Sequence, residues 1–432
     1  MKRISNSFLL ILFSVCLMYG QQDTYIFKYR SQAVEYQQAV KAAQSGLEGA
    51  NSLLDASKAG FLPKVDMDGY YNFNGVPMQL AATPDSPDGQ ELSHMYELGL
   101  WVSQPVLTGG YLKNTRSLAM ARTDVARSFV GLTEQNTMLE ADIRYLTVVA
   151  RKEISELTKK YRDAIGQFEQ VIQDRVDEEV VGMNELYQAR VRFNDAQYEV
   201  ISMEKEYKVS LMELNRLIGV PMMTETEHLD SLLVVDWKSP EADRVDKALQ
   251  MRPEVSLKEN EMMMNQFDEK ITASYYNPQI NVGAGGTYGA PSPGLLTEPG
   301  PNYHVNANLA IPIFYWGQKK SMVFAKQQVT EQSKLELERT VDMVTLQVTA
   351  AYYELERSQD QVDFAVGALD NAGKNADVML DRYREGLSSV LEVLDAQLFW
   401  QKSYNNYINA KFELNIANST YLKAMGELSI AE

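Results

Sequence analysis

The sequence contains few of the residues that metal, redox or nucleic-acid chemistry requires. Its 432 residues include one cysteine and three histidines, too few for a zinc cage or a disulfide framework. Positive charge is also short, because 41 lysines and arginines face 58 aspartates and glutamates, giving a net charge of −17. Proteins that bind nucleic-acid phosphates have the opposite excess. We therefore expect no metal site, no cofactor and no nucleic-acid partner. Neither a catalytic triad nor a phosphate-binding loop is recognisable, so we expect no enzymatic activity.

Long apolar runs are also missing. The run from Phe8 to Tyr19 follows two basic residues, precedes a polar stretch and contains the single cysteine, Cys16. This pattern is typical of a secretory signal peptide, so residues 1–20 are interpreted as one and the protein as exported. No later run approaches the roughly 18 apolar residues of a transmembrane helix. We therefore expect any entry into a membrane to be through β-strands.

The chain carries one plan twice. The segment VSQPVLTGGYLKN returns, 207 residues later, as LAIPIFYWGQKK. The same offset relates Pro105 to Pro312, Gly110 to Gly317, Tyr145 to Tyr352, Arg175 to Arg382, Glu185 to Glu392, Ala189 to Ala396 and Gly219 to Gly426. A turn and a terminal glycine that recur at one constant spacing indicate an internal repeat. We expect a first repeat over 21–219, a linker over 220–245 and a second repeat over 246–432.

Each repeat ends in a segment with helical periodicity. Between residues 337 and 383, apolar and small residues recur at alternating steps of four and three, the 3.5-residue period of a coiled-coil seam. A second such series covers 393–428, and the turn REGLSS lies between the two. The first repeat has a comparable arrangement that turns near Val181. The pattern predicts two long antiparallel helical hairpins, over 111–219 and 317–429.

Shorter segments before each hairpin alternate as strands do. The alternation predicts a strand pair in each repeat, within 64–106 and 279–314, with these four strands: 64–74, 96–106, 279–288 and 303–314. A helix precedes each pair, at 29–60 and 246–275. The alternation suits a membrane strand and a half-buried soluble sheet equally well, although Trp101 interrupts the polar face. Four strands cannot close a membrane barrel, which needs about eight, so a membrane location requires an oligomer.

Together these features resemble the TolC family of outer-membrane efflux proteins. The resemblance rests on the duplicated plan, the QPVLTGG and IPIFYWG turns and the segment REGLSSVLEVLDAQ, and it covers essentially the whole mature chain. It implies a mostly helical homotrimer with a periplasmic α-barrel, in which each subunit gives four strands to one twelve-stranded transmembrane β-barrel. It also implies the outer membrane of a Gram-negative envelope, contact with its lipid, and two protein partners. These are a periplasmic adaptor (membrane fusion) protein and an inner-membrane transporter of the RND, ABC or MFS type.

The resemblance also implies roles for residues at the hairpin ends. Glu392 and Asp395 match two acids that ring the closed channel entrance, and Tyr383 and Glu185 match a hydrogen-bonded pair that latches the gate. The family's latch arginine is replaced by Ser388. Four residues match the positions that meet the adaptor: Val181, Gly182, Gly386 and Leu387. Without the resemblance, the acids read as solvated surface residues and the glycines as turn residues.

The function implied is that of a passive exit duct in a tripartite efflux system, gated at its periplasmic end. Two alternatives stay open. The same architecture serves as the outer-membrane component of type I protein secretion systems. A periplasmic coiled-coil scaffold without a pore also fits the helical periodicity. No motif identifies the exported substrate or the class of transporter.

Overall fold

The computed structural model describes residues 25–80, 90–235, 243–291 and 298–430; the predicted signal peptide, residues 1–20, lies outside them. As predicted, the described chain is mostly helical with a small β part. None of its helices is both long and apolar enough to cross a membrane. The chain forms two compact units, and each unit draws on both sequence repeats. One unit comprises residues up to Ser45, 128–256 and 339–432, and the other comprises 46–127 and 257–338.

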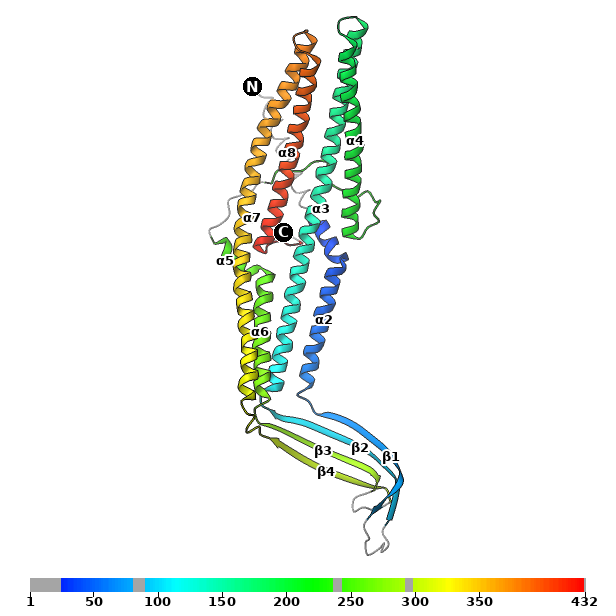
Figure 1. The fold of residues 1–432 in the computed structure, drawn as a ribbon, viewed down its shortest axis with the longest axis vertical. Helices are drawn as coiled ribbons and strands as arrows, with labels where there is room; N and C mark the ends of the chain where they lie inside the picture. The colour runs from blue at the N-terminus through cyan, green and yellow to red at the C-terminus, as the bar shows by residue number, and fades with distance from the viewer. Residues whose placement is uncertain (1–24, 81–89, 236–242, 292–297, 431–432) are drawn as a thin grey trace, which may run out of the picture. The chain divides into compact units, whose positions relative to one another are not determined.

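The two predicted helical hairpins are present (Figure 1). The first consists of α3 (Tyr111–Asp177) and α4 (Met183–Ile218), the second of α7 (Gln318–Arg384) and α8 (Val390–Met425). The long helices α3 and α7 have 67 residues each, and α4 and α8 have 36 each. Equal lengths in both repeats are what an internal duplication predicts. Each 67-residue helix is about 100 Å long at 1.5 Å per residue.

The coiled-coil periodicity marks the buried stripe of α7. Val344, Val348, Leu355 and Val362 are at most 2% exposed, and they follow one another at steps of four and seven residues. In α8, Val393 and Leu414 are completely buried. A 3.5-residue repeat keeps one helix face directed at its neighbours along the whole helix. The spacing of apolar residues therefore determines which face of each hairpin is buried.

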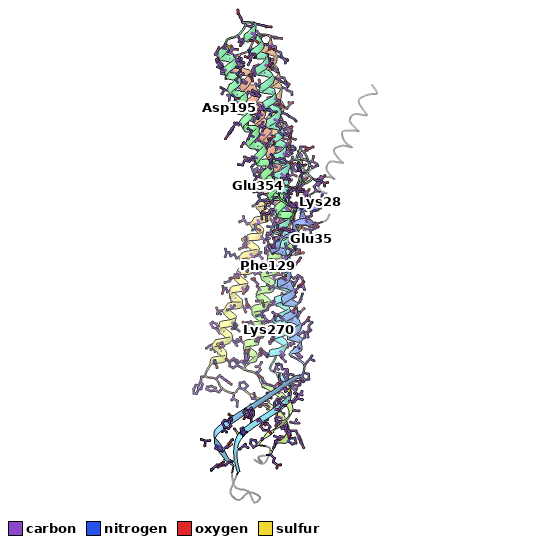
Figure 2. All side chains as sticks on the ribbon, turned by 90° about the vertical axis from the view of Figure 1, so that its right-hand side faces the viewer. Lys28, Glu35, Phe129, Asp195, Lys270 and Glu354 are labelled. Carbon is purple, nitrogen blue, oxygen red and sulfur yellow. The ribbon has the colours of Figure 1, made fainter. Side chains whose placement is uncertain are left out.

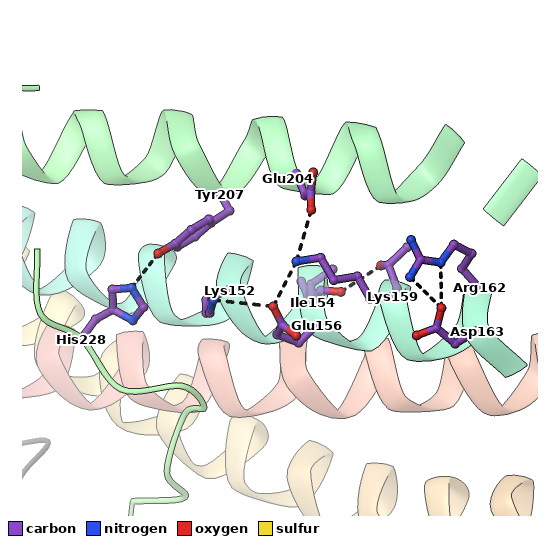
Figure 3. A network of polar contacts seen from close by, with 10 residues as sticks. Lys152, Ile154, Glu156, Lys159, Arg162, Asp163, Glu204, Tyr207 and His228 are labelled. Atoms are coloured by element: carbon purple, nitrogen blue, oxygen red, sulfur yellow. Dashed lines mark hydrogen bonds and ion pairs between the residues drawn. The ribbon is translucent and has the colours of Figure 1, made fainter. Parts of the chain in front are cut away.

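Ion pairs join the two helices of the first hairpin along its more exposed side. The Lys159 ammonium on α3 lies 3.2 Å from Glu156 on the same helix and 3.2 Å from Glu204 on α4 (Figure 3). Arg144 pairs in the same way with Glu213 of α4, at 2.6 Å. Partly exposed pairs of this kind each contribute about 1 kcal/mol or less. They fix the register of the hairpin more than they stabilise it.

A buried ion pair fixes the segment between the repeats. Lys411 of α8 is 4% exposed, and its ammonium lies 2.8 Å from a carboxylate oxygen of Glu153 on α3. Both groups also bond the backbone of Leu232, whose carbonyl accepts from Lys411 at 3.0 Å and whose N–H donates to Glu153 at 3.0 Å. All the hydrogen-bonding groups in this network have partners, as buried charges require. The network therefore ties the segment around residue 232 to both hairpins.

The helices that precede the strands are each interrupted once. Where we expected one helix over 29–60, residues 25–36 are helical and α2 (Gln38–Ala59) follows after Gln37. The helix expected over 246–275 is divided into α5 (Arg244–Met251) and α6 (Pro253–Ser274). Proline disfavours helical geometry in the preceding residue but is well suited to the first turn of a helix. Arg252 is accordingly extended, with ψ of 123°.

The four strands form one antiparallel sheet in the order β1-β2-β3-β4: β1 (Lys64–Leu80), β2 (Gln90–Thr108), β3 (Gln279–Ala290) and β4 (Gly300–Ala310). β4 ends at Ala310 rather than at residue 314 as expected. Ala310 pairs with Gln279, the first residue of β3, so the residues beyond it have no neighbouring strand in the described chain. Pro312 also lacks the N–H that a strand would use. β1 and β2 are longer than predicted because their pairing continues beyond Phe73 after a register shift.

The two faces of the sheet differ sharply in polarity. One face carries Met67, Leu100 and Val305, which are 67%, 54% and 82% exposed. The register places polar residues such as Asp66 and Asn306 on the opposite face. A half-buried soluble sheet would cover its apolar face, whereas this face is open in the isolated chain. A large exposed apolar surface marks a region that meets lipid or another protein.

Candidate functional site at the hairpin ends

The turn of the second hairpin is defined by two capping motifs. After α7 ends, Gly386 adopts a left-handed conformation (φ 75°), and its N–H donates to the Tyr383 carbonyl at 3.0 Å. The N–H of Leu387 donates to the Arg382 carbonyl at 2.8 Å, which completes a Schellman motif. Ser389 and Glu392 then form a capping box at the start of α8. The segment REGLSSVLE therefore encodes one helix end, one reversal and one helix start.

The turn of the first hairpin repeats this geometry with a different residue at its centre. Glu179 stands 207 residues before Gly386 and has a left-handed φ of 59°. The Val180 N–H donates to the Arg175 carbonyl at 2.8 Å, as in the second turn. A non-glycine residue pays a conformational cost in this region. Both turns therefore have the same backbone geometry, and only the second, which has a glycine at this position, adopts it without this cost.

The four predicted adaptor-docking residues all lie in these turns. Gly182 and Gly386 are exposed, and Leu387 is 63% exposed. Val181 is half-buried and packs against the apolar cluster between the hairpin ends. Leu387 is therefore the one of the four that presents an apolar side chain to solvent. Their role in docking stays a prediction.

Tyr383, one half of the predicted gate latch, is buried at the end of α7. It is 2% exposed and packs edge-on against Phe168, with ring centres 5.0 Å apart. Its hydroxyl has no hydrogen-bond partner among the described residues, so no bond joins it to Glu185. Burial raises the pKa of Tyr383; Arg175 acts to lower it and the nearby Glu185 carboxylate to raise it. The latch pair is thus close together but not hydrogen-bonded.

Arg175 joins the two hairpin ends, a contact that was not predicted from the sequence. Its guanidinium, on α3, donates to the carbonyls of Tyr383 at 2.9 Å and of Arg384 at 3.1 Å. It also lies 4.7 Å from the centre of the Tyr383 ring, a cation–π contact. A cation at these carbonyls is favourable because the last turn of a helix carries unpaired acceptors and the negative end of its dipole. The sequence signal was the repeated pair Arg175 and Arg382, which identifies the position but not the contact.

The predicted acidic pair has local partners. Glu392 accepts hydrogen bonds from the Ser389 N–H at 2.7 Å and the Ser389 hydroxyl at 3.0 Å. These bonds, the backbone one above all, hold the pKa of Glu392 below its usual value. Asp395 lies 3.9 Å from Arg192 of α4, and both side chains are substantially exposed. Ser388, which stands where the resemblance leads us to expect a latch arginine, donates to the Met379 carbonyl at 3.0 Å.

An apolar groove between α4 and α8 lies beside this site. Its walls include Tyr187, Val191 and Leu391, each more than half exposed, and it encloses about 470 Å³. Arg192 and Asp195 of α4 border it, and Asp195 is labelled in Figure 2. This groove was not predictable from the sequence because the two helix starts that form it are distant in the chain. Elsewhere in the described residues, no cluster of three or more His, Cys, Asp or Glu is arranged to hold a metal ion.

Comparison with known proteins agrees with this architecture. A family model for outer membrane efflux proteins matches residues 29–220 and 245–427, which are most of both repeats. A pyoverdine export outer membrane protein, OpmQ of Pseudomonas aeruginosa, is 22% identical over 316 residues. That match spans 71% of this chain and 63% of OpmQ, less than two thirds of its length.

Two further matches cover nearly the whole chain. The outer membrane protein TolC of Vibrio cholerae is 19% identical over 419 residues, which are 92% of this chain and 90% of that protein. Among solved structures, the CmeC outer membrane channel of Campylobacter jejuni superposes with a TM-score of 0.79 at 16% identity. It covers 94% of this chain and 87% of its own. At this identity the structural match establishes a shared fold.

Proposed function

Because the chain belongs to the outer membrane efflux protein family, we propose that it is the passive exit duct of a tripartite efflux system. The family places it in the outer membrane and among proteins that are not enzymes. The observation that carries the proposal is a sheet with one open apolar face and one polar face, joined to two hairpins of equal length. A sheet of this kind suits a wall between lipid and water, and paired hairpins suit a tube below it.

The strand number supports a homotrimer. Four strands are too few to close a transmembrane barrel, and three copies supply twelve. In this homotrimer the face with Met67 and Leu100 contacts outer-membrane lipid, and the face with Asp66 and Asn306 lines the water-filled lumen. Cyclic symmetry repeats every lumen residue three times. The helical hairpins extend into the periplasm.

The hairpin ends supply the gate and the docking surface. Glu392 and Asp395 of three subunits place six carboxylates at the entrance, which favours passage of cations. Tyr383 and Glu185 form the latch region, and Arg175 holds the two hairpin ends together there. Val181, Gly182, Gly386 and Leu387 meet the periplasmic adaptor; the adjacent apolar groove between α4 and α8 extends this surface. An inner-membrane transporter of the RND, ABC or MFS type supplies the energy.

Single-channel recording of the purified trimer in a planar bilayer tests the proposal. The wild type is compared with Glu392→Gln/Asp395→Asn, in which glutamine preserves the capping box while the charge is lost. A matched control, Glu338→Gln/Asp342→Asn, removes the same charge from α7 far from the turn. We expect cation-selective openings that lose selectivity in the first variant and keep it in the control.

The outcome separates the alternatives. A folded trimer that never opens, even with Arg175→Gln, contradicts the conduit and supports a scaffold. The exposed apolar face of the sheet already favours the conduit, since a soluble scaffold has no use for it. A type I secretion duct forms the same pore, so only loss of a secreted protein rather than of drug resistance in a deletion strain identifies it.

A further inference from the structure

Trp101 stands on the polar face of the sheet, where its neighbours are charged or small. It is paired with Asp66 on β1 and with Gly285 on β3. The indole ring lies flat over two glycines. A Cβ added to Gly285 would be 2.2 Å from the ring, and one added to Gly99 would be 2.7 Å from the indole nitrogen. The two glycines therefore leave the space that the ring occupies, because a side chain at either position would clash with it.

The ring borders a hollow of ligand size. The imidazole of His304 on β4 lies 4.6 Å from Trp101, between ring centres, at an angle of 53°. Both residues line a hollow of about 540 Å³, which also contacts Ser103, Asn281, Asn306 and Tyr275. Small-molecule sites have volumes of about 300–1,000 Å³ and combine aromatic surface with a few polar groups. One face of the indole packs on the sheet, and the Trp101 side chain is partly exposed.

Carboxylates lie beside the indole, whereas the charged residue that lines the hollow itself is Lys64. The strand register places Asp66, Asp68 and Glu97 on the same face as Trp101, with Asp66 directly paired with it. Negative charge beside an aromatic face attracts cations twice, through the carboxylates and through the ring quadrupole. Planar aromatic ligands also stack on a fixed indole more readily than flexible ones, because the ring is already ordered.

We propose that Trp101 and His304 form a binding site for planar aromatic cations on the polar face of the sheet. In the trimer three such sites face the lumen, so the exit of the duct interacts with cationic aromatic cargo as it leaves. The lumen location rests on the proposed function, whereas binding itself needs only the sheet. The site accounts for an aromatic residue that otherwise interrupts the polar face.

The test uses methyl viologen, a planar aromatic dication that quenches tryptophan fluorescence on contact, and its uncharged analogue 4,4′-bipyridine. The full-length protein carries Trp237→Phe, Trp316→Phe and Trp400→Phe, so that only Trp101 fluoresces. Two neighbouring substitutions are compared. Gly285→Ala places a methyl group where the indole ring lies and so displaces the ring, whereas the methyl group of Gly286→Ala meets only a backbone oxygen at 3.4 Å on the other face. Asp66→Asn tests the contribution of charge without altering the two glycines against which the indole packs.

We expect saturable quenching by methyl viologen, weaker by about tenfold in Gly285→Ala and unchanged in Gly286→Ala. Asp66→Asn should weaken the quenching by methyl viologen and leave the quenching by 4,4′-bipyridine unchanged. In bilayers, the same dication should reduce the current through open channels. Linear quenching that is alike in both glycine variants, with channels that open normally, overturns the site and leaves the proposed function intact. Saturable quenching without any channel activity overturns the proposed function and leaves the site.

Discussion

At the scale of single residues, the clearest contact between the two hairpin ends is made by Arg175. Replacing it with glutamine removes two hydrogen bonds from a charged donor and a cation–π contact. We expect the closed state to lose about 2 kcal/mol of stability. Hydrogen bonds from charged donors contribute about 1.5–3 kcal/mol each, and the Arg175 guanidinium is partly exposed. In bilayer recordings, Arg175→Gln should raise the open probability of the resting channel at least about tenfold.

Tyr383→Phe provides the matched comparison for this prediction. The hydroxyl that it removes is buried without a hydrogen-bond partner, so its loss should not weaken the closed state. We expect an open probability close to that of the wild type. If Tyr383→Phe opened the channel while Arg175→Gln did not, the latch would depend on a bond from Tyr383 to Glu185 that forms only in the trimer.

Glu179 is a second residue with a definite energetic consequence. Its left-handed backbone costs about 1–2 kcal/mol for a residue with a side chain, and glycine avoids this cost. Glu179→Gly should therefore stabilise the hairpin by about 1 kcal/mol, and Gly386→Ala should destabilise the other by a similar amount. Thermal unfolding followed by helical circular dichroism measures both. Glu178→Gly is the control, and a rise in its unfolding temperature equal to that of Glu179→Gly would refute the argument.

The capping box at Glu392 predicts a dependence on pH. Because its pKa is lower in the folded chain than in the unfolded one, the carboxylate stabilises the fold above its unfolded pKa of about 4.3. This contribution disappears as pH falls through the folded value. Unfolding temperatures measured between pH 3 and pH 6 should therefore fall less steeply on acidification in Glu392→Gln than in the wild type. Parallel curves would show that the capping box does not stabilise the fold through its charge.

At the scale of elements, the segment around Leu232 depends on the buried pair of Lys411 and Glu153. Lys411→Met leaves the Glu153 carboxylate buried without its cation, which typically costs 3–5 kcal/mol. The double variant Lys411→Met/Glu153→Leu should recover part of that loss, because it removes the buried charge, although the Leu232 N–H and carbonyl lose these partners. Chemical denaturation of the three proteins tests this. A double variant less stable than Lys411→Met would show that Glu153 acts mainly by binding the Leu232 backbone.

Element types were predictable from the sequence, and their ends were less so. The 3.5-residue spacing that includes Val344 and Val348 identified α7 because it follows from packing that persists over many turns. The break at Arg252 was also encoded, in Pro253, but helical periodicity on both sides concealed it. The end of β4 at Ala310 depends on where its partner β3 begins. No local pattern in one strand contains that information.

The candidate site was predictable only in part. The resemblance and the repeat offset located both hairpin turns and their acids, since turn chemistry is local. They did not reveal that Arg175 on α3 reaches carbonyls 208 and 209 residues away, or that Glu392 caps its own helix. Contacts between distant segments arise from tertiary packing, which spacing along one segment does not specify.

At the scale of the whole molecule, neither repeat should fold alone. Each compact unit combines residues from both repeats, and the core that contains Tyr145 also contains Ile408. A fragment of residues 21–219 lacks α8, so the buried stripe of α3 is left open. We expect this fragment to be insoluble or largely unfolded and to regain helical signal when mixed with residues 220–432. Circular dichroism of each fragment and of the mixture measures this, and a cooperative unfolding transition in either fragment alone would contradict it.

The shared core also sets a timetable for biosynthesis. The core around Tyr145 cannot be completed until Ile408 has been synthesised, 263 residues later. At about 5–20 residues per second, that delay is on the order of ten to fifty seconds. Throughout this interval the apolar stripe of α3 and the open face of the sheet are exposed to every other nascent chain in the compartment. The duplication that gives the hairpins their equal lengths therefore leaves the nascent polypeptide with exposed apolar surface until its last helix has been made.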